Sequence, residues 1–255
     1  MSYRTVNPYT GEQVAEFPYA TDADVAQALD AAHQAFEAWR LTPFATRTAV
    51  LRSAAAGLRQ HAADYARLLT LEMGKLTSEA LAEVELSAQI LSYYADHAEA
   101  QLQPRPLLSA DPAVLNARID HEPLGVILAV EPWNFPYYQI ARILAPQLAA
   151  GNTLVLKHAS NVPQCAMAFE RLMRDAGLPT GGFQNLFASR EQIETIINDP
   201  RVQGVAFTGS ENAGAHLASL AGKAMKKVTL ELGGADAFVV LDDADLDLAV
   251  RWAVF

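Results

Sequence analysis

Polar side chains interrupt the long apolar stretch 124–157 (LGVILAVEPWNFPYYQIARILAPQLAAGNTLVLK) at positions where they could act chemically. Asn134 follows a first run of strand-forming residues, Lys157 ends a second run, and Arg142 is the only charged residue between them. An amide or a cation can donate to a carbonyl oxygen, a carboxylate or a hydroxyl group. The stretch is typical of a strand–helix–strand unit, and parallel sheets bind ligands beyond the carboxyl ends of their strands. Asn134 and Lys157 both fall at that edge, so the sequence predicts a ligand site there.

A second motif, residues 204–210 (GVAFTGS), leads from a predicted strand into a helix that begins at Glu211. The first N–H groups of such a helix lack partners, and together with the helix dipole they favour a phosphate. Gly209 and Gly214 would let the backbone approach the ligand closely. The alternative is an ordinary strand–helix turn in which Thr208 and Glu211 form a capping pair. Because the sequence has no G-x-G-x-x-G fingerprint, an ordinary Rossmann dinucleotide site is not indicated.

A third motif places Glu231 at the end of a predicted strand, followed by Gly233 and Gly234. A carboxylate before two glycines is able to turn towards a ligand. To act as a general base it would need a pKa raised by burial. The alternative is a solvated glutamate in a loop.

Other reactive residue types are sparse in this sequence. Cys165, the only cysteine, falls in the first turn of a predicted apolar helix, where a small core residue is expected. The six histidines are scattered without a pair at ligand spacing, so no metal site is predicted. The sequence has no G-x-S-x-G elbow, which argues against an α/β-hydrolase.

Composition narrows the class of protein. The 255 residues allow one large domain or two small ones, and 51% of them are hydrophobic, enough for a sizeable core. A formal net charge of −10 argues against nucleic acid or an anionic membrane surface as the main partner. The polar first residues do not resemble a signal peptide, and a single cysteine suits a reducing compartment. We therefore expect a soluble, cytoplasmic protein with no membrane span.

The first half of the chain is predicted to be mainly helical. Two short strands are expected on either side of a turn at residues 7–11, and Thr21 with Asp24 forms a variant of the capping box. Helical stretches are predicted over residues 43–74 and 77–101, and apolar–polar alternation over residues 114–121 predicts an exposed or half-buried strand. The first helix carries apolar residues at helical spacing: Val25, Leu29, Ala32, Phe36 and Trp39.

The second half alternates between strands and helices, which predicts a doubly wound, mostly parallel α/β sheet covered on both faces. A final amphipathic helix begins near Ala244 and still continues at Phe255, so we expect the sequence to stop inside a larger fold. Strands are predicted at residues 125–130, 153–157, 184–187, 204–208, 227–232 and 238–241. Helices are predicted at residues 137–150, 163–176, 191–198 and 211–221.

Taken together, these segments resemble the aldehyde dehydrogenase superfamily over the whole chain. The matching motifs occur in the family's order and at suitable separations. They are residues 7–12 (NPYTGE), 35–40 (AFEAWR), 132–136 (PWNFP), 207–210 (FTGS) and 231–234 (ELGG).

The resemblance implies catalytic roles for two residues and a nicotinamide cofactor, NAD or NADP. Asn134 matches the amide that donates to the substrate oxyanion, and Glu231 matches the base that activates water to hydrolyse a thioester. The substrate implied is a small aldehyde. The residues that match the family's cofactor site are Trp133, Lys157, Gly209, Ser210 and Gly233.

Two departures from the usual family pattern refine this interpretation. The family often has Lys-Pro-Ser-Glu where this chain has KHAS at residues 157–160, and that glutamate repels a 2′-phosphate. Ser160 lacks the charge, so NADP should be tolerated. Arg142 lies at a position that resembles the substrate-carboxylate arginine of succinate-semialdehyde dehydrogenases. The alternative is an arginine that reaches the surface or pairs with a local acid.

The family's nucleophilic cysteine lies downstream of its Glu-Leu-Gly-Gly motif, and Cys165 does not match it. The resemblance therefore implies that residues 1–103 and 124–255 form an NAD(P)-binding domain, that residues 104–123 form an oligomerisation arm, and that the catalytic domain is absent. The complete enzyme would be a homo-oligomer. We expect the cofactor-binding portion of a succinate-semialdehyde dehydrogenase; the alternative is an inactive nucleotide-binding or structural fragment.

Overall fold

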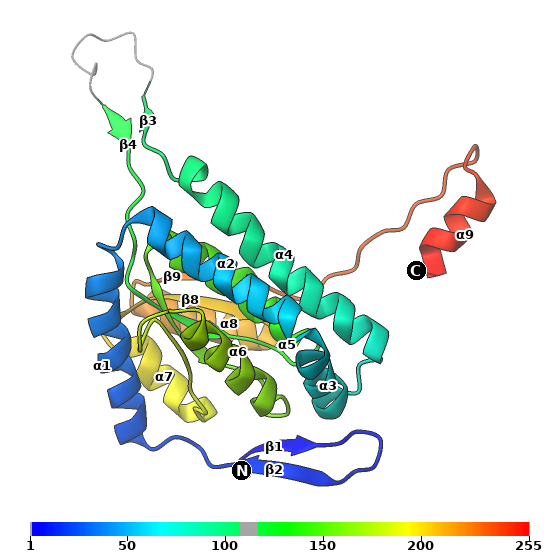
Figure 1. Cartoon of the computed structure of the whole chain (residues 1–255), viewed down its shortest axis with the longest axis horizontal. Coiled ribbons are helices and arrows are strands. Elements are labelled where there is room, and N and C mark those ends of the chain that lie inside the picture. Colours follow the sequence, from blue (N-terminus) through cyan, green and yellow to red (C-terminus); the bar gives the residue numbers. More distant parts are fainter. Residues whose placement is uncertain (1, 108–116, 255) are drawn as a thin grey trace.

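A parallel five-stranded sheet forms the centre of the computed structural model, which describes residues 2–107 and 117–254 (Figure 1). The strand order is β7-β6-β5-β8-β9. Five of the six strands predicted in this half are confirmed, with small shifts of their ends. Their bounds are β5 (Val126–Val130), β6 (Thr153–Lys157), β7 (Phe183–Asn185), β8 (Val202–Thr208) and β9 (Lys227–Glu231).

The connections confirm a doubly wound fold. From β5 the chain crosses through α5 (Pro136–Ala150) and α6 (Pro163–Asp175), which pack on one face of the sheet. It then returns through α7 (Arg190–Asn198) and α8 (Glu211–Lys223), which pack on the other face. The direction of winding reverses between β5 and β8, because β5 pairs with both β6 and β8. Such a switch point is where doubly wound folds bind ligands.

The N-terminal helices complete the layers on both faces. The helix α1 (Asp22–Trp39) begins with the predicted Thr21–Asp24 capping box and packs with α7 and α8. On the other face α2 (Phe44–Gln60), α3 (Ala62–Met73) and α4 (Thr77–Gln101) pack with α5 and α6 in one core. All five apolar residues predicted for α1 are buried, whereas the predicted stretch 43–74 divides into two helices. The division falls at His61, whose φ of −114° and ψ of 28° are not helical.

A short hairpin brings the N-terminus to the carboxyl edge of the sheet. It consists of β1 (Tyr3–Val6) and β2 (Gln13–Phe17), joined by the predicted turn. Arg4 N donates to Ser160 O at 2.9 Å, and the buried Tyr3 hydroxyl donates to Ala188 O at 2.9 Å. The hairpin therefore places the side chain of Tyr3 beside the loops that follow β6 and β7.

A second ribbon, β3 (Arg105–Pro106) with β4 (Arg118–Ile119), projects from the body beyond the end of α4 (Figure 1). Its exposed residues agree with the predicted strand only in part, because residues 114–116 lie outside the described residues. The ribbon has the projecting form that the resemblance implies, and its role in assembly stays a prediction.

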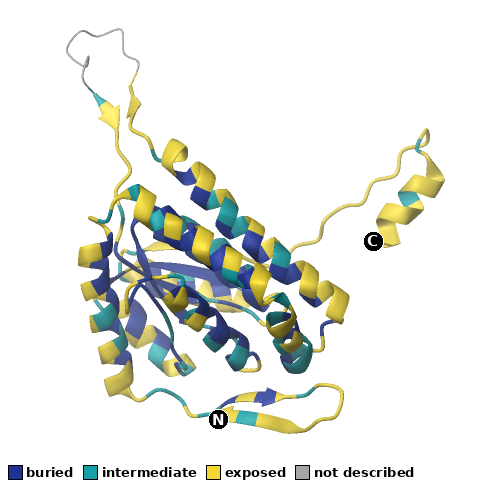
Figure 2. Cartoon of the chain, in the orientation of Figure 1, coloured by how far each residue is buried: buried dark blue, intermediate teal, exposed yellow. Residues whose placement is uncertain are grey.

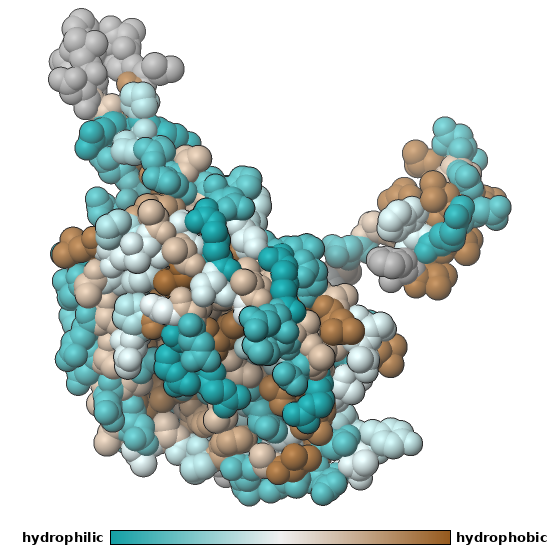
Figure 3. Space-filling view, in the orientation of Figure 1, coloured by the Kyte–Doolittle hydropathy of each residue, from teal (hydrophilic) through white to brown (hydrophobic). Residues whose placement is uncertain are grey.

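The predicted strand at residues 238–241 is wrong. This segment is irregular and exposed, and it leads away from the sheet to α9 (Leu246–Val254), which confirms the predicted last helix (Figures 1 and 2). Its apolar residues alone could not make it a strand, because a strand needs the backbone of a neighbour to bond with. Figure 3 shows hydrophobic side chains gathered on the surface of α9, where Leu246 is 69% exposed. Among the described residues, no helix is long and apolar enough to cross a membrane.

Two buried carboxylates from neighbouring helices cap α5 and α6. Both helices begin with proline and follow an apolar residue, Phe135 or Val162, that makes no side-chain cap. Glu83 of α4 instead accepts from the backbone N–H groups of Tyr137 and Tyr138, at 2.9 and 3.3 Å.

Glu72 of α3 does the same for α6, accepting from the N–H groups of Gln164 and Cys165 at 2.9 Å each. A buried helix end without partners is unstable, so these two carboxylates fix where α5 and α6 begin.

Glu83 also forms a buried salt bridge with Lys75. Replacing Glu83 with alanine would leave the Lys75 ammonium and two backbone N–H groups without their acceptor. We expect Glu83→Ala to lower the free energy of unfolding by about 3–5 kcal/mol. Glu85→Ala on the same helix removes an exposed ion pair with Arg59 and should cost at most about 1 kcal/mol. Urea denaturation measures both changes. Similar losses in the two variants would show that the buried cap is not the important interaction.

Candidate functional site

Strand register brings the ends of the sheet strands level with one another. Val130 at the end of β5 lies opposite Lys157 of β6 and Phe207 of β8, and Thr208 lies opposite Glu231 of β9. The loops that follow these strands therefore leave the sheet at one edge, which we name the carboxyl edge. Most of the residues predicted from sequence to act lie on or directly after these strand ends.

Arg142 and Glu231 meet in a cavity of about 200 Å³ at the carboxyl edge. Arg142 donates from Nη2 to the Thr208 hydroxyl at 2.8 Å, and its Nη1 lies 3.3 Å from Glu231 Oε2. The Nε of Arg142 is buried and has no hydrogen-bond partner among the described residues. Arg142 is therefore paired with a local acid, as the alternative prediction holds, and it keeps one unused donor.

Glu131 is a buried acid beside this pair that the sequence analysis did not single out. It is 3% exposed, and neither carboxylate oxygen makes a well-formed hydrogen bond to a described residue. Burial raises the pKa of Glu131 well above its ordinary value, while Thr208 and Arg142 act in the opposite direction. Burial therefore favours the neutral form of this carboxyl group, and Arg142 forms its salt bridge with Glu231. The place of Glu131 directly after an apolar strand is the signal that could have revealed it.

The loop that carries Asn134 is fixed through its backbone. Lys75 Nζ donates to the carbonyl oxygen of Asn134 at 3.0 Å and lies 3.6 Å from the centre of the Phe135 ring. The side chains of Asn134 and Trp133 are both exposed at the carboxyl edge. A fixed backbone with an exposed amide suits a donor that meets its acceptor only when a substrate is bound.

Lys157 and Ser160 line a second cavity, of about 480 Å³. Tyr3 and Tyr19 contribute from the N-terminal segment. Burial lowers the pKa of Lys157, and the nearby charge of Arg190 lowers it further. The structure thus brings together two residues, Lys157 and Ser160, that the family resemblance links to the cofactor.

The turn between β8 and α8 is tightly packed around Gly209. Ser210 is the N-cap of α8 and accepts from Ala213 N at 3.4 Å, so the predicted Thr208–Glu211 capping pair is wrong. A Cβ on Gly209 would lie 2.6 Å from the Phe207 ring, so only glycine fits there. The first turn of α8 is exposed, whereas Gly233 lies in open space and is not drawn into either cavity.

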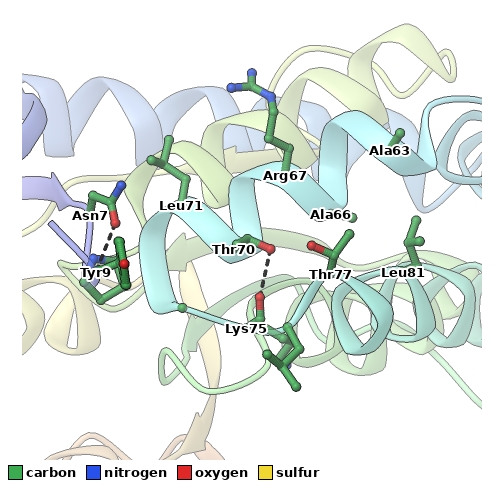
Figure 4. Close-up of a pocket in the computed structure, with 13 residues that line it drawn as sticks. Asn7, Tyr9, Ala63, Ala66, Arg67, Thr70, Leu71, Lys75, Thr77 and Leu81 are labelled. Carbon is green, nitrogen blue, oxygen red and sulfur yellow. Dashed lines mark hydrogen bonds between the residues drawn. The ribbon is translucent and has the colours of Figure 1, made fainter.

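A larger cavity, of about 830 Å³, lies elsewhere (Figure 4). Figure 4 shows Leu71 of α3 near Asn7 and Tyr9, with Ala63 of α3 and Leu81 of α4 towards the opposite end. None of the residues predicted to act lines this cavity. Its size therefore does not make it the candidate site.

Cys165 is buried at the start of α6 and is not placed to act as a nucleophile. Burial raises the pKa of its thiol well above the usual range, and the charge of Glu72 raises it further. The thiolate form that reacts is therefore disfavoured. In residues 2–107 and 117–254, no cluster of three histidine, cysteine or acidic side chains is placed to hold a metal ion.

The fold and the residues at its carboxyl edge define a doubly wound α/β protein with two cavities at that edge of the sheet. Comparison with known proteins gives the family. The sequence matches the aldehyde dehydrogenase family over residues 1–255, and the chain belongs to that family.

Similar proteins include a succinate-semialdehyde dehydrogenase [NADP(+)] of Deinococcus radiodurans, which is 47% identical over 98% of this chain and 52% of its own length. A crystal structure of succinic semialdehyde dehydrogenase from Streptococcus pyogenes with NADP+ is 47% identical, with a TM-score of 0.94 over 98% of this chain and 54% of that chain. The chain spans about half the length of the curated relatives it matches.

The buried His158, which lies between Lys157 and Ser160 in the sequence, should make stability depend on pH. Its Nε2 lies 3.1 Å from Pro136 O, while its Nδ1 accepts from Ala159 N at 2.8 Å, so the folded ring is neutral. Burial lowers the pKa of His158 to about 4, whereas an unfolded histidine titrates near 6.5. The unfolded state therefore takes up the proton first, and stability is lost as the pH falls from about 6.5 to about 4, by up to about 3 kcal/mol.

Denaturant unfolding of the wild type and of His158→Asn across this pH window tests the prediction. The wild type should lose stability more steeply than the variant between pH 6.5 and 4. Parallel pH profiles would mean that His158 does not contribute to the loss.

Proposed function

We propose that this chain is the cofactor-binding portion of an NAD(P)-dependent aldehyde dehydrogenase that oxidises succinate semialdehyde, or a similar short aldehyde with a distal carboxylate, to the acid. The observation that carries the proposal is the meeting of Arg142, Thr208 and Glu231 in one cavity at the carboxyl edge. An arginine with an unused buried donor is suited to a substrate carboxylate. The names of the relatives point to the same substrate.

The residues of the larger edge cavity fit the adenosine end of NAD or NADP. An ammonium, a hydroxyl and two tyrosines line a space of about 480 Å³, and Gly209 leads into the exposed first turn of α8. Lys157 and Ser160 would hold the ribose, and the N-terminus of α8 after Ser210 would hold the pyrophosphate. Trp133 and Gly233 would contact the nicotinamide end. The bound cofactor supplies a hydride acceptor.

The chain's own residues then have distinct roles in the complete enzyme. The Asn134 amide donates to the substrate carbonyl oxygen as negative charge develops on it. Arg142 binds the distal carboxylate of the substrate and so releases Glu231, which takes a proton from the attacking water. The thiol nucleophile does not come from this chain, because its only cysteine is buried in the core.

We further propose the division of the chain implied by the family. Residues 1–103 and 124–255 form the cofactor-binding domain, and residues 104–123 form an oligomerisation arm of a cytoplasmic homo-oligomer. The projecting β3–β4 ribbon and the single cysteine support this proposal.

A chimaera that joins residues 1–255 to the remaining C-terminal portion of the Deinococcus radiodurans relative tests the function. It should oxidise succinate semialdehyde with NADP, whereas residues 1–255 alone should not. Asn134→Ala should lower kcat of the chimaera by about 100- to 1,000-fold. The control Cys165→Ser should keep its activity. Turnover by residues 1–255 alone that Cys165→Ser abolishes would refute the assigned roles.

Arg142→Leu in the same chimaera tests the substrate class. The loss of a charge-assisted pair should lower kcat/KM for succinate semialdehyde by about 30- to 100-fold. An uncharged aldehyde of similar length should be affected little or react faster. Equal losses on the two substrates would show that Arg142 only orients Glu231.

A further inference from the structure

A basic residue outside the family motifs lines the larger edge cavity. The cavity is bounded by residues from the N-terminal segment, from the chain after β6 and from the start of α7. Arg190 is the first residue of α7, and together with Lys157 it gives the cavity two cations. No motif of the sequence analysis includes Arg190, and the roles proposed above do not use it.

The half-buried Lys157 and the exposed Arg190 have no carboxylate partner among the described residues. Neither Lys157 nor Arg190 forms a salt bridge within the described part of the chain. The Lys157 ammonium lies 5.6 Å from the centre of the Tyr3 ring, and the charge of Arg190 lowers its pKa. Two like charges facing one cavity repel each other, and a bound anion would remove that cost.

One carboxylate, Glu191, also lines the cavity and must be weighed against the cations. Its side chain is exposed, and the pKa of its carboxyl is lowered first by the Ser189 hydroxyl and also by the charge of Arg190. One acid against two bases leaves the cavity with one unbalanced positive charge. A ligand with a dianionic group would therefore still be attracted.

The remaining groups at this place are those that bind phosphate. Ser160 offers a hydroxyl at the position where an acid would repel an anion, and its carbonyl is already occupied by Arg4 N at 2.9 Å. Arg190 stands at the positive end of a helix that Ser189 caps. A guanidinium fork, an ammonium and a hydroxyl together match the oxygens of a phosphate monoester.

We propose that Arg190 binds the 2′-phosphate of NADP together with Lys157 and Ser160, and that it makes this chain prefer NADP to NAD. The inference rests on the proposed cofactor site and adds a residue that determines which cofactor binds. The phosphate is the group that distinguishes the two cofactors, so Arg190 should affect NADP alone. NAD lacks the group and would leave the two cations unneutralised.

Calorimetric titration of residues 1–255 with NADP, NAD, adenosine 2′,5′-bisphosphate and inorganic phosphate tests the proposal. Arg190→Gln should weaken NADP and the bisphosphate by about 10- to 100-fold, as expected for a charge-assisted contact. Binding of NAD should change by less than about threefold. Arg190→Lys keeps the charge but loses the fork, so it should lie between the wild type and Arg190→Gln.

Two further variants make the comparison specific. Arg174→Gln removes the same charge from α6 on the other face of the sheet and should leave all four titrations unchanged. Glu191→Gln removes the competing carboxylate and should strengthen NADP without affecting NAD.

The outcomes separate this inference from the proposed function. If the wild type binds NADP and NAD but Arg190→Gln weakens them equally or not at all, the inference alone is overturned. If inorganic phosphate binds as tightly as the bisphosphate, the cavity is a general anion site and the assignment to NADP fails. A wild type that binds neither cofactor nor the bisphosphate would overturn both the cofactor site and the role of Arg190.

Discussion

The carboxyl edge depends on two buried carboxylates that cap helices to which they do not belong. Glu83 and Glu72 supply the acceptors that the apolar N-cap positions of α5 and α6 lack. Through Lys75, which bonds both Glu83 and the Asn134 carbonyl, the same interaction fixes the loop that carries the predicted oxyanion donor. A carboxylate in a helix–helix interface is costly unless it is fully bonded, and here the free backbone N–H groups make it so. The same hydrogen bonds therefore pack the outer helices and place the candidate site.

Charge at the carboxyl edge is divided between two cavities, although the chain as a whole carries a net charge of −10. In the smaller cavity burial raises the pKa of Glu131, and Arg142 pairs with the more exposed Glu231. In the larger cavity cations outnumber acids. An acidic protein thus presents one cavity in which cations are in excess, beside another in which Arg142 is balanced by Glu231. Local burial and pairing decide this arrangement, and net charge does not.

Much of the fold could be predicted because its signals are local. The capping box at Thr21, the apolar spacing of α1 and the apolar run of β5 are each encoded by residues close together in the sequence. The prediction failed where a partner from elsewhere decides the outcome. Residues 238–241 are apolar enough for a strand but have no neighbouring backbone to pair with. A different kind of failure occurs at His61, where non-helical backbone angles divide the predicted helical stretch.

From the sequence alone, the order and spacing of the motifs determined that this chain belongs to a doubly wound family. They also determined which residues end its strands. Tertiary structure alone decided what those residues contact. The pairing of Arg142 with Glu231, the burial of Glu131 near both and the nearness of Arg190 to Lys157 all join positions on different strands and helices. No local pattern encodes such contacts, because parallel strands are brought together by crossover helices and the strand register sets which ends meet.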